Sequence, residues 1–307
     1  MEDRIYDLII IGGGPAGLTA GLYAARGRID CVLLEKLSPG GQVLNTDWVE
    51  NWPGDKGISG FDLVDKIRAH AQHFGLTIEN KEVVGLNLTD KIKEVILADG
   101  VVRCKSLIIA SGANPTKLRV KGEQLLAGKG VSYCGTCDGP FYRDQVVASV
   151  GGGDTAVEES IFLTKFARKV YLIHRRDQLR AAKIAQERAM ANEKIECVWD
   201  TVVKSIEGQD KVERIRLVNV KTGQESSLDV DGVFVFVGIK PNTEFIGDGL
   251  ERDMAGFIKT NLEMETSIDG VFAAGDVIIK QMRQICTAVG DGATALHSAQ
   301  LYLEKFE

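Results

Sequence analysis

The chain of 307 residues has a mass of 33.4 kDa, which exceeds one ordinary domain and suffices for two domains that each bury a core. Its 37 lysine and arginine residues oppose 43 aspartate and glutamate residues, giving a formal charge of -6 without a block of like charge. This balance excludes the basic surface of a nucleic-acid-binding protein and the cationic patch of a membrane-surface protein. We therefore expect an acidic, soluble enzyme that binds neither nucleic acid nor membrane.

The first residues bear on the location of the protein. Residues 1–4 are Met-Glu-Asp-Arg, and the apolar run that follows ends at Gly12. This run is too short to span a bilayer, and its acidic flank does not suit a signal peptide. We therefore expect a cytoplasmic protein. In that compartment a disulfide is more often catalytic than structural, so the six cysteines are expected to be mostly buried thiols.

A repeat with a fixed offset organises the chain. Residues 7–17 read as an apolar strand followed by a glycine turn, and a helical stretch is predicted over residues 18–26. The same pattern returns over residues 146–156, with a helical stretch over residues 157–166. The glycines of the two turns, and the ends of the strands that follow the helices, stand 139 positions apart. The sequence therefore predicts two βαβ nucleotide-binding units in tandem.

The glycines stand where a dinucleotide-binding turn needs them. Gly12, Gly14 and Gly17 would allow a tight turn, a close approach to a pyrophosphate and a helix packed against its strand. In the second turn Ala156 takes the third position, which this fingerprint also allows. The alternative is two ordinary tight turns in a parallel sheet. The agreement of strand, glycines and following strand argues against it.

The ends of the following strands indicate which nucleotide binds where. Glu35 lies 18 residues after Gly17, where a carboxylate can accept hydrogen bonds from a free ribose of FAD or NAD. The second unit instead has a basic cluster of His174, Arg175, Arg176 and, one helical turn further, Arg180. Guanidinium groups bind a 2'-phosphate that a carboxylate would repel, so NADPH is expected there. A solvated basic loop is the alternative.

A Cys-x-x-Cys pair lies between the two turns. Cys134 and Cys137 are followed by Asp138. In a redox pair one thiol attacks a partner disulfide, the other resolves the intermediate, and a neighbouring carboxyl moves the proton. A zinc site, and hence a metal, is not expected, because the other four cysteines form no second pair and no histidine has ligand spacing beside this one. Two buried thiols beside a turn are the alternative.

Together the motifs resemble the bacterial low-molecular-weight thioredoxin reductases, which are NADPH-dependent, FAD-containing pyridine nucleotide-disulfide oxidoreductases of class II. The resemblance covers nearly the whole chain. The segments that carry it are Gly12–Gly17, Gly40–Gln42, Glu50–Gly54, Ala110–Ala113, Cys134–Gly139, Gly151–Glu159, His174–Asp177, Arg180–Ala181, Phe272–Val277 and Arg283–Gln284. One departure is Gly135, where many relatives place alanine, and glycine loosens the backbone beside the attacking thiol.

The resemblance implies a role for each matching residue. FAD would be held by Gly12, Gly14, Pro15, Ala16, Gly17, Glu35, Gly41, Gln42, Asn51, Ala110, Gly112, Gly275, Asp276, Arg283 and Gln284. NADPH would be held by Gly152, Gly153, Asp154, Thr155, His174, Arg175, Arg176 and Arg180. Cys137 would face the flavin, Cys134 would attack thioredoxin, and Asp138 would be the acid.

The resemblance also implies an α/β fold with two Rossmann-like, doubly wound, three-layer domains. An NADPH-binding domain of residues 116–242, which carries the redox disulfide, would be inserted into an FAD-binding domain of residues 1–115 and 243–307. The family rotates the NADPH domain between half-reactions, because nicotinamide and disulfide cannot share one face of the flavin, and the two linkers would be the hinges. A homodimer through the FAD domain is implied as well.

The predicted function is thus electron transfer from NADPH through FAD and the Cys134/Cys137 disulfide to oxidised thioredoxin. Two alternatives remain: an NAD(P)H-dependent flavin reductase for another small redox protein, and a redox-sensing nucleotide-binding module. Ferredoxin-type relatives lack the cysteine pair, which this chain has. Two nucleotide motifs together with Asp138 favour turnover over sensing.

Overall fold

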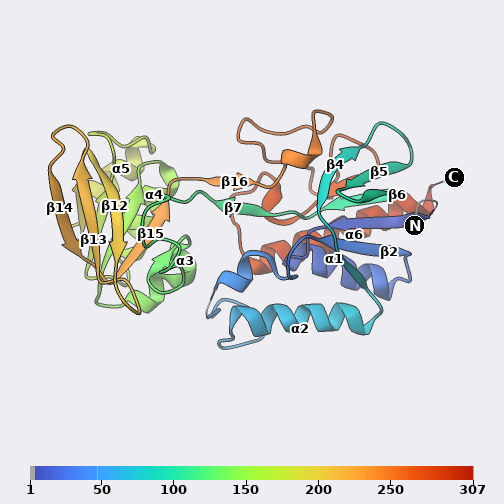
Figure 1. The fold of residues 1–307 in the computed structure, drawn as a ribbon, viewed down its shortest axis with the longest axis horizontal. Coiled ribbons are helices and arrows are strands. Elements are labelled where there is room, and N and C mark those ends of the chain that lie inside the picture. The colour runs from blue at the N-terminus through green and yellow to red at the C-terminus, as the bar shows by residue number, and fades with distance from the viewer. Residues whose placement is uncertain (1–3, 47, 307) are drawn as a thin grey trace. The chain divides into compact units, whose positions relative to one another are not determined.

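The computed structural model describes residues 4–46 and 48–306, so the acidic flank of Glu2 and Asp3 lies outside the described residues. The chain divides into two compact units. The first unit runs to Asn114 and resumes at Lys240, and the second unit spans Pro115–Ile239. Figure 1 shows the order of the elements along the chain in each unit. In the described part of the chain, none of the helices combines the length and the apolar character needed to cross a membrane.

The first unit is built on a seven-stranded sheet. Its strands are β1 (Ile5–Ile11), β2 (Cys31–Glu35), β3 (Thr77–Asn80), β4 (Val83–Asn87), β5 (Lys93–Leu97), β6 (Gly100–Ile109) and β17 (Val271–Ala273). The order is β3-β2-β1-β6-β5-β4, with β17 also paired to β6. The pairs among β3, β2, β1 and β6 are parallel, and the pairs of β5 with β4 and β6 are antiparallel. The first half of β6 pairs with β5 and its second half pairs in parallel with β17.

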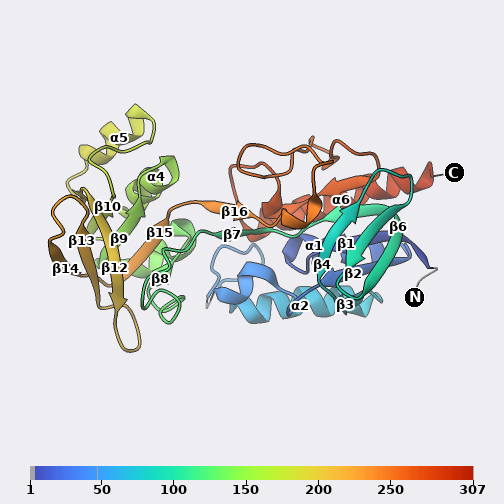
Figure 2. The same cartoon turned by 45° about the horizontal axis from the view of Figure 1, so that its top comes forward.

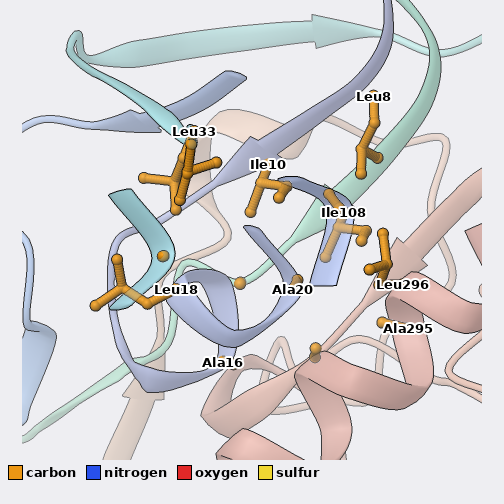
Figure 3. Close-up of a cluster of buried hydrophobic side chains, with 14 of the residues drawn as sticks. Leu8, Ile10, Ala16, Leu18, Ala20, Leu33, Ile108, Ala295 and Leu296 are labelled. Atoms are coloured by element: carbon orange, nitrogen blue, oxygen red, sulfur yellow. The ribbon is translucent and has the colours of Figure 1, made fainter. Parts of the chain in front are cut away.

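Three α-helices complete the first unit, together with short 3-10 turns. The α-helices are α1 (Pro15–Arg26), α2 (Gly60–His73) and α6 (Ile285–Glu304). The 3-10 turns are η1 (Gly41–Asn45), η3 (Glu244–Ile246) and η4 (Gly275–Val277). Strand β1 is buried on both faces, as strands of parallel sheets usually are. Leu8 and Ile10 pack in one cluster with residues of α1 and α6 (Figure 3), whereas Ile9 and Ile11 belong to a second cluster on the other face.

The second unit has two sheets. A parallel sheet in the order β11-β10-β9-β15-β8 consists of β8 (Val131–Ser132), β9 (Val146–Gly151), β10 (Lys169–Ile173), β11 (Ile195–Val198) and β15 (Gly232–Phe236). An antiparallel sheet consists of β12 (Thr201–Glu207), β13 (Arg214–Asn219) and β14 (Glu225–Asp229). The helices are α3 (Gly135–Asp138), η2 (Gly139–Tyr142), α4 (Asp154–Leu163) and α5 (Lys183–Met190).

These elements of the second unit form three layers, which Figure 2 shows from a second direction. Ala148 and Val233 of the parallel sheet pack against Ile215 and Leu217 of the antiparallel sheet. On the opposite face of the parallel sheet, Leu172 packs in a cluster with side chains of α4 and α5. The third layer is therefore a small antiparallel sheet.

The chain passes between the units at two short strands that pair with each other, β7 (Ala113–Pro115) and β16 (Ile239–Pro241). On one side of this ribbon the amide of Thr116 donates to the carbonyl of Gly238 over 2.9 Å. On the other side the amide of Asn242 donates to the carbonyl of Gly112 over 3.0 Å. Gly238 has a φ of 127°, a conformation that favours glycine at this crossing.

The strand, turn, helix and strand predicted twice from the sequence are present twice, as β1-α1-β2 and β9-α4-β10. The helices begin three residues earlier than predicted, because Gly14 and Gly153 are extended caps and the turns beyond them are already helical. Pro15 suits the first helical position, where its missing amide hydrogen costs nothing. The second helix was predicted too long, since it ends at Leu163 with Thr164 as its C-cap.

Candidate active site

The turn between β1 and α1 has glycines at the three positions of the fingerprint, and only two of them are needed for the packing of the turn. Gly12 has a φ of 104°, and a Cβ there would overlap with the carbonyl of Ala110, the residue that follows β6. A Cβ on Gly17 would overlap with the carbonyl oxygen of Gly12. At Gly14, by contrast, a Cβ would meet no heavy atom within 4 Å. The turn is therefore packed tightly beneath and open above, which fits the pyrophosphate of a dinucleotide.

The carboxylate of Glu35, at the end of β2, is anchored beside this turn. Its Oε2 accepts the amide of Gly13 over 2.7 Å, and its Oε1 accepts the amide of Leu37 over 2.9 Å. Each oxygen keeps a further lone pair for a ribose hydroxyl. Gly41, with a φ of 60°, lies against the turn, since a Cβ there would be 3.2 Å from the Cα of Gly14.

Segments that are distant in sequence meet near the same turn. Gly275 has a φ of 79°, and a Cβ there would lie 2.9 Å from the Cβ of Ala16 in α1. The side-chain amide of Asn51 donates to the side chain of Gln284 over 3.0 Å. The predicted FAD residues thus come from both sequence segments of the first unit, as the carboxyl ends of parallel strands require.

Asn114 and Asn242 extend this set, although no sequence motif marked them. The side chain of Gln42 donates to Asn114, and Asn114 donates to Asn242 over 2.8 Å. Asn242 in turn exchanges hydrogen bonds with Ser111, whose hydroxyl donates to its carbonyl over 2.7 Å. This chain of polar contacts joins the strand that leaves the first unit to the strand that returns.

A buried charge cluster lies at η4. Asp276 has a buried Oδ1 without a hydrogen-bond partner in the described part of the chain. Burial raises the pKa of this carboxyl, Lys280 and Arg283 partly offset the rise, and Asp291 adds to it. Asp291 itself pairs with Lys280 and accepts the amide of Gly275 over 3.1 Å. An unpaired buried oxygen is costly unless a ligand supplies a donor, so Asp276 fits a cofactor hydroxyl.

Arg283 is fixed by contacts with the first unit. Its guanidinium donates to the carbonyl of Lys280 over 3.0 Å and lies over the ring of Phe257, 4.4 Å from its centroid. Burial lowers the pKa of Arg283, while Asp276 and then Asp253 oppose this shift. Its Nε is buried without a partner among the described residues. This donor and the Asp276 oxygen leave two complementary groups for one ligand.

The second glycine turn repeats the first with one difference. Gly153, like Gly14, has no heavy atom within 4 Å of the place of a Cβ. At Gly152 a Cβ would overlap with the imidazole of His174, which is buried under the turn. Burial lowers the pKa of His174, because a charged ring would lose its hydration there. His174 therefore supports the turn from below rather than presenting a cation to solvent.

The arginines of the basic cluster are exposed at the same turn. Arg175, Arg176 and Arg180 have exposed side chains, and Thr155 is exposed at the first turn of α4. The amide of Arg180 donates to the carbonyl of Gly152 over 2.7 Å. The prediction of a helical turn before Arg180 was wrong, because α5 begins only at Lys183. A bend instead brings Arg180 onto the glycine turn, and Asp154 anchors this bend by accepting the amide of Ala182 over 2.7 Å.

Cys134 and Cys137 form a disulfide across the short helix α3, with their Cα atoms 5.3 Å apart. Cys134 caps this helix, and the amide of Cys137 donates to Sγ of Cys134 over 3.2 Å. The amide of Cys134 donates to the hydroxyl of Ser132 over 3.1 Å. A sulfur that accepts a backbone hydrogen bond is favoured as the thiolate, so the geometry favours Cys134 as the nucleophile.

Asp138 is the last residue of α3, and its amide donates to the carbonyl of Cys134 over 3.2 Å. Asp138 is half-buried, and its negative charge affects the hydroxyl of Tyr142. Burial raises the pKa of that hydroxyl to about 12, and the charges of Asp138 and Asp231 add to the rise. Asp138 thus lies in the same helix turn as the cysteine pair, and its role as an acid stays a prediction.

Comparison with known proteins places the chain in a family. The family of pyridine nucleotide-disulphide oxidoreductases matches residues 6–292. The thioredoxin reductase of Listeria innocua is 45% identical over 308 residues, covering 100% of this chain and 96% of the relative, and that of Bacillus subtilis is 44% identical with 100% and 97% covered. The crystal structure of thioredoxin reductase from Streptococcus pyogenes has a TM-score of 0.95 at 47% identity and covers 99% of this chain and 100% of that chain.

The chain belongs to the pyridine nucleotide-disulphide oxidoreductase family. The family resemblance and the α/β fold class predicted from the sequence are confirmed. The roles of individual residues stay predictions that the geometry makes testable.

Alanine substitutions at Gly14 and Gly153 test which nucleotide binds at which turn. Gly14→Ala and Gly153→Ala should both fold, because a Cβ meets no heavy atom and both residues have a negative φ. Gly14→Ala should weaken FAD binding by at least about tenfold, roughly 1.4 kcal/mol, because the methyl group fills the space of the pyrophosphate. Gly153→Ala should weaken NADPH binding instead and retain FAD. Titrations of both nucleotides against both variants would contradict the assignment if each variant lost the other nucleotide.

The buried carboxyl of Asp276 predicts a pH-dependent stability. Its raised pKa means that the folded protein holds a proton which the unfolded chain has released, so this residue destabilises the fold increasingly as the pH rises. The free energy of unfolding of the FAD-free protein, minus that of Asp276→Asn, should therefore fall from about pH 4 towards pH 7. Urea unfolding at a series of pH values measures it. A difference that is constant with pH would contradict the burial argument.

Proposed function

We propose that this chain is a thioredoxin reductase, which takes electrons from NADPH and delivers them through FAD and its own disulfide to the disulfide of thioredoxin. The function, the enzyme class and the two cofactors predicted from the sequence agree with the relatives matched over the full chain. The single observation that carries the proposal is the Cys134–Cys137 disulfide, whose Cys134 sulfur accepts a backbone amide.

The first unit is proposed as the FAD-binding domain. FAD supplies a carrier that accepts two electrons from NADPH and passes them to a disulfide. The glycine turn at Gly14 would hold the pyrophosphate, Glu35 would accept the ribose hydroxyls, and the unpaired Oδ1 of Asp276 would accept a hydroxyl of the ribitol chain. Arg283 and Gln284 would lie along the flavin, with Gln284 oriented by Asn51.

The second unit is proposed as the NADPH-binding domain. The turn at Gly153 would hold the pyrophosphate of NADPH, and the exposed Arg175, Arg176 and Arg180 would bind the 2'-phosphate. The ring of His174 would keep the turn in shape from below. Because this cluster offers guanidinium groups and no carboxylate at the strand end, NADPH should be preferred over NADH.

The thiol chemistry would use Cys134, the N-cap of α3, together with Cys137 and Asp138 of that helix. Two electrons and one proton would open the disulfide to one thiol and one thiolate. The Cys134 thiolate would attack a sulfur of oxidised thioredoxin and form a mixed disulfide, while Asp138 would protonate the departing thioredoxin sulfur. Cys137 would then attack the Cys134 sulfur, and its thiol proton would pass to the departing thioredoxin sulfur, which restores the Cys134–Cys137 disulfide and releases thioredoxin as a dithiol. The backbone hydrogen bond to the Cys134 sulfur supports this order of attack.

The sequence boundaries after residues 115 and 242 are proposed as the domain boundaries, with the two crossing strands β7 and β16 as hinges for rotation between half-reactions. Only these two strands lead from one unit to the other along the chain. A covalent crosslink between the units should stop turnover while FAD remains bound. Full activity in a crosslinked protein would contradict the proposed rotation.

A cytoplasmic location and a homodimer through the FAD-binding domain complete the proposal. A disulfide that must be reopened in each cycle fits the compartment in which thiols are kept reduced. Sedimentation equilibrium of the FAD-loaded protein should give twice the chain mass of 33.4 kDa. The mass of a single chain would contradict the dimer, and cell fractionation tests the location.

The function is tested by NADPH oxidation with thioredoxin and insulin as the final disulfide, beside an NADH control. Turnover should require thioredoxin, prefer NADPH and fall to background in Cys134→Ser, because the nucleophile that forms the mixed disulfide is gone. Cys31→Ser, which changes a cysteine of the first unit outside the pair, is the matched control and should keep turnover. Flavin reduction without transfer to thioredoxin would move the function to another small redox protein.

A further inference from the structure

Glu159, on α4, is a half-buried carboxyl that lies beside the redox pair and that the proposed mechanism does not use. Its side chain points to the first residue of α3: a Cβ on Gly135 would overlap with Oε2 of Glu159 and lie 3.2 Å from its carboxyl carbon. The next atom, on the ring of Phe236, is 3.4 Å away, an ordinary contact. The missing side chain at Gly135 therefore leaves the space that the Glu159 carboxyl fills.

The carboxyl of Glu159 is affected by both burial and nearby backbone amides. Its Oε2 is buried and has no hydrogen-bond partner in the described part of the chain. Burial and then the charge of Glu158 raise the pKa of Glu159, while the backbone amides of Gly135 and Thr136 lower it. These amides belong to the residues between the two cysteines. The carboxyl of Glu159 thus lies against the backbone that links Cys134 to Cys137.

We propose that Glu159 is a positioning residue of the redox pair, which holds the first turn of α3 and opposes the negative charge that appears when the disulfide opens. The inference rests on the proposed function, in which two electrons and one proton convert the disulfide to a thiol and a thiolate. A carboxylate nearby makes the thiolate less favourable and so keeps the reduction potential of the pair low. A mere packing role would be filled at lower cost by an apolar side chain of similar volume.

Glu159→Gln tests the charge while keeping the shape. The FAD-loaded variant should favour the dithiol by about tenfold when equilibrated with a dithiothreitol redox buffer, a rise of about 30 mV in the potential of the pair. The oxidised fraction is read by alkylation and mass spectrometry of the peptide that contains both cysteines. Glu158→Gln is the matched control, since that carboxyl is the exposed neighbour on the same helix and, unlike Glu159, is not among the atoms nearest to a Cβ on Gly135.

Gly135→Ala tests the same contact from the other side. The new methyl group would displace the Glu159 carboxyl, so it should raise the potential in the wild-type background. In a Glu159→Ala background nothing remains for the methyl group to displace, so the same substitution should leave the potential nearly unchanged. This difference between backgrounds measures the coupling of the two positions, and circular dichroism of each variant checks that all four proteins are folded.

The outcomes separate this inference from the proposed function. A potential that is unchanged in Glu159→Gln, or equal effects of Gly135→Ala in both backgrounds, would overturn the positioning role while thioredoxin turnover stood. If the wild-type protein did not reduce thioredoxin but the potential still shifted as expected, the proposed acceptor would be wrong and the role of Glu159 would hold.

Discussion

The close approach of backbone to backbone at the two glycine turns is the constraint on which both nucleotide sites depend. At Gly17 and at Gly151 a Cβ would overlap with a carbonyl oxygen of a neighbouring segment. Helices α1 and α4 therefore begin directly against their sheets, with free amides at their first turns. The same condition recurs where α6 crosses α1, since a Cβ on Gly292 would overlap with the carbonyl of Ala16. Without these glycines the helices would move away, and the anion sites would be lost.

Around these fixed turns, the two units place different chemistry on the same scaffold. In the first unit the strand after the helix ends in Glu35, whose carboxylate is held by the amide of Gly13. In the second unit the equivalent position is His174, which packs under the turn, and the exposed arginines beyond it are the residues proposed for nucleotide recognition. The same backbone thus carries a carboxylate at the end of the second strand in the first unit and positively charged side chains after that strand in the second unit. The difference is confined to a few side chains.

The sequence predicted well what depends on local pattern and poorly what depends on distant contacts. The repeat with its glycines located both turns, because strand, tight turn and helix follow each other within about 30 residues. The exact ends of the helices were missed, since a cap decides them. The bend before Arg180 was also missed, since a single backbone hydrogen bond decides it. Asn242 and Asp291 carried no signal, because their partners lie more than ten residues away and only the folded chain joins them. The sequence marked Gly135 as a departure, but the close contact of this position with the carboxyl of Glu159 could be seen only in the structure.

The division of the first unit into two sequence segments has a consequence for biosynthesis. Strand β17 and helix α6 are synthesised after the inserted unit, yet β17 completes the sheet beside β6 and α6 packs with α1. The inserted unit, whose sheets use only its own residues, can finish folding while the first unit still exposes an unpaired strand edge and an apolar helix face. Asp276 and Arg283 belong to the same later segment, so under the proposed function the flavin site would be complete only after the inserted unit has been synthesised.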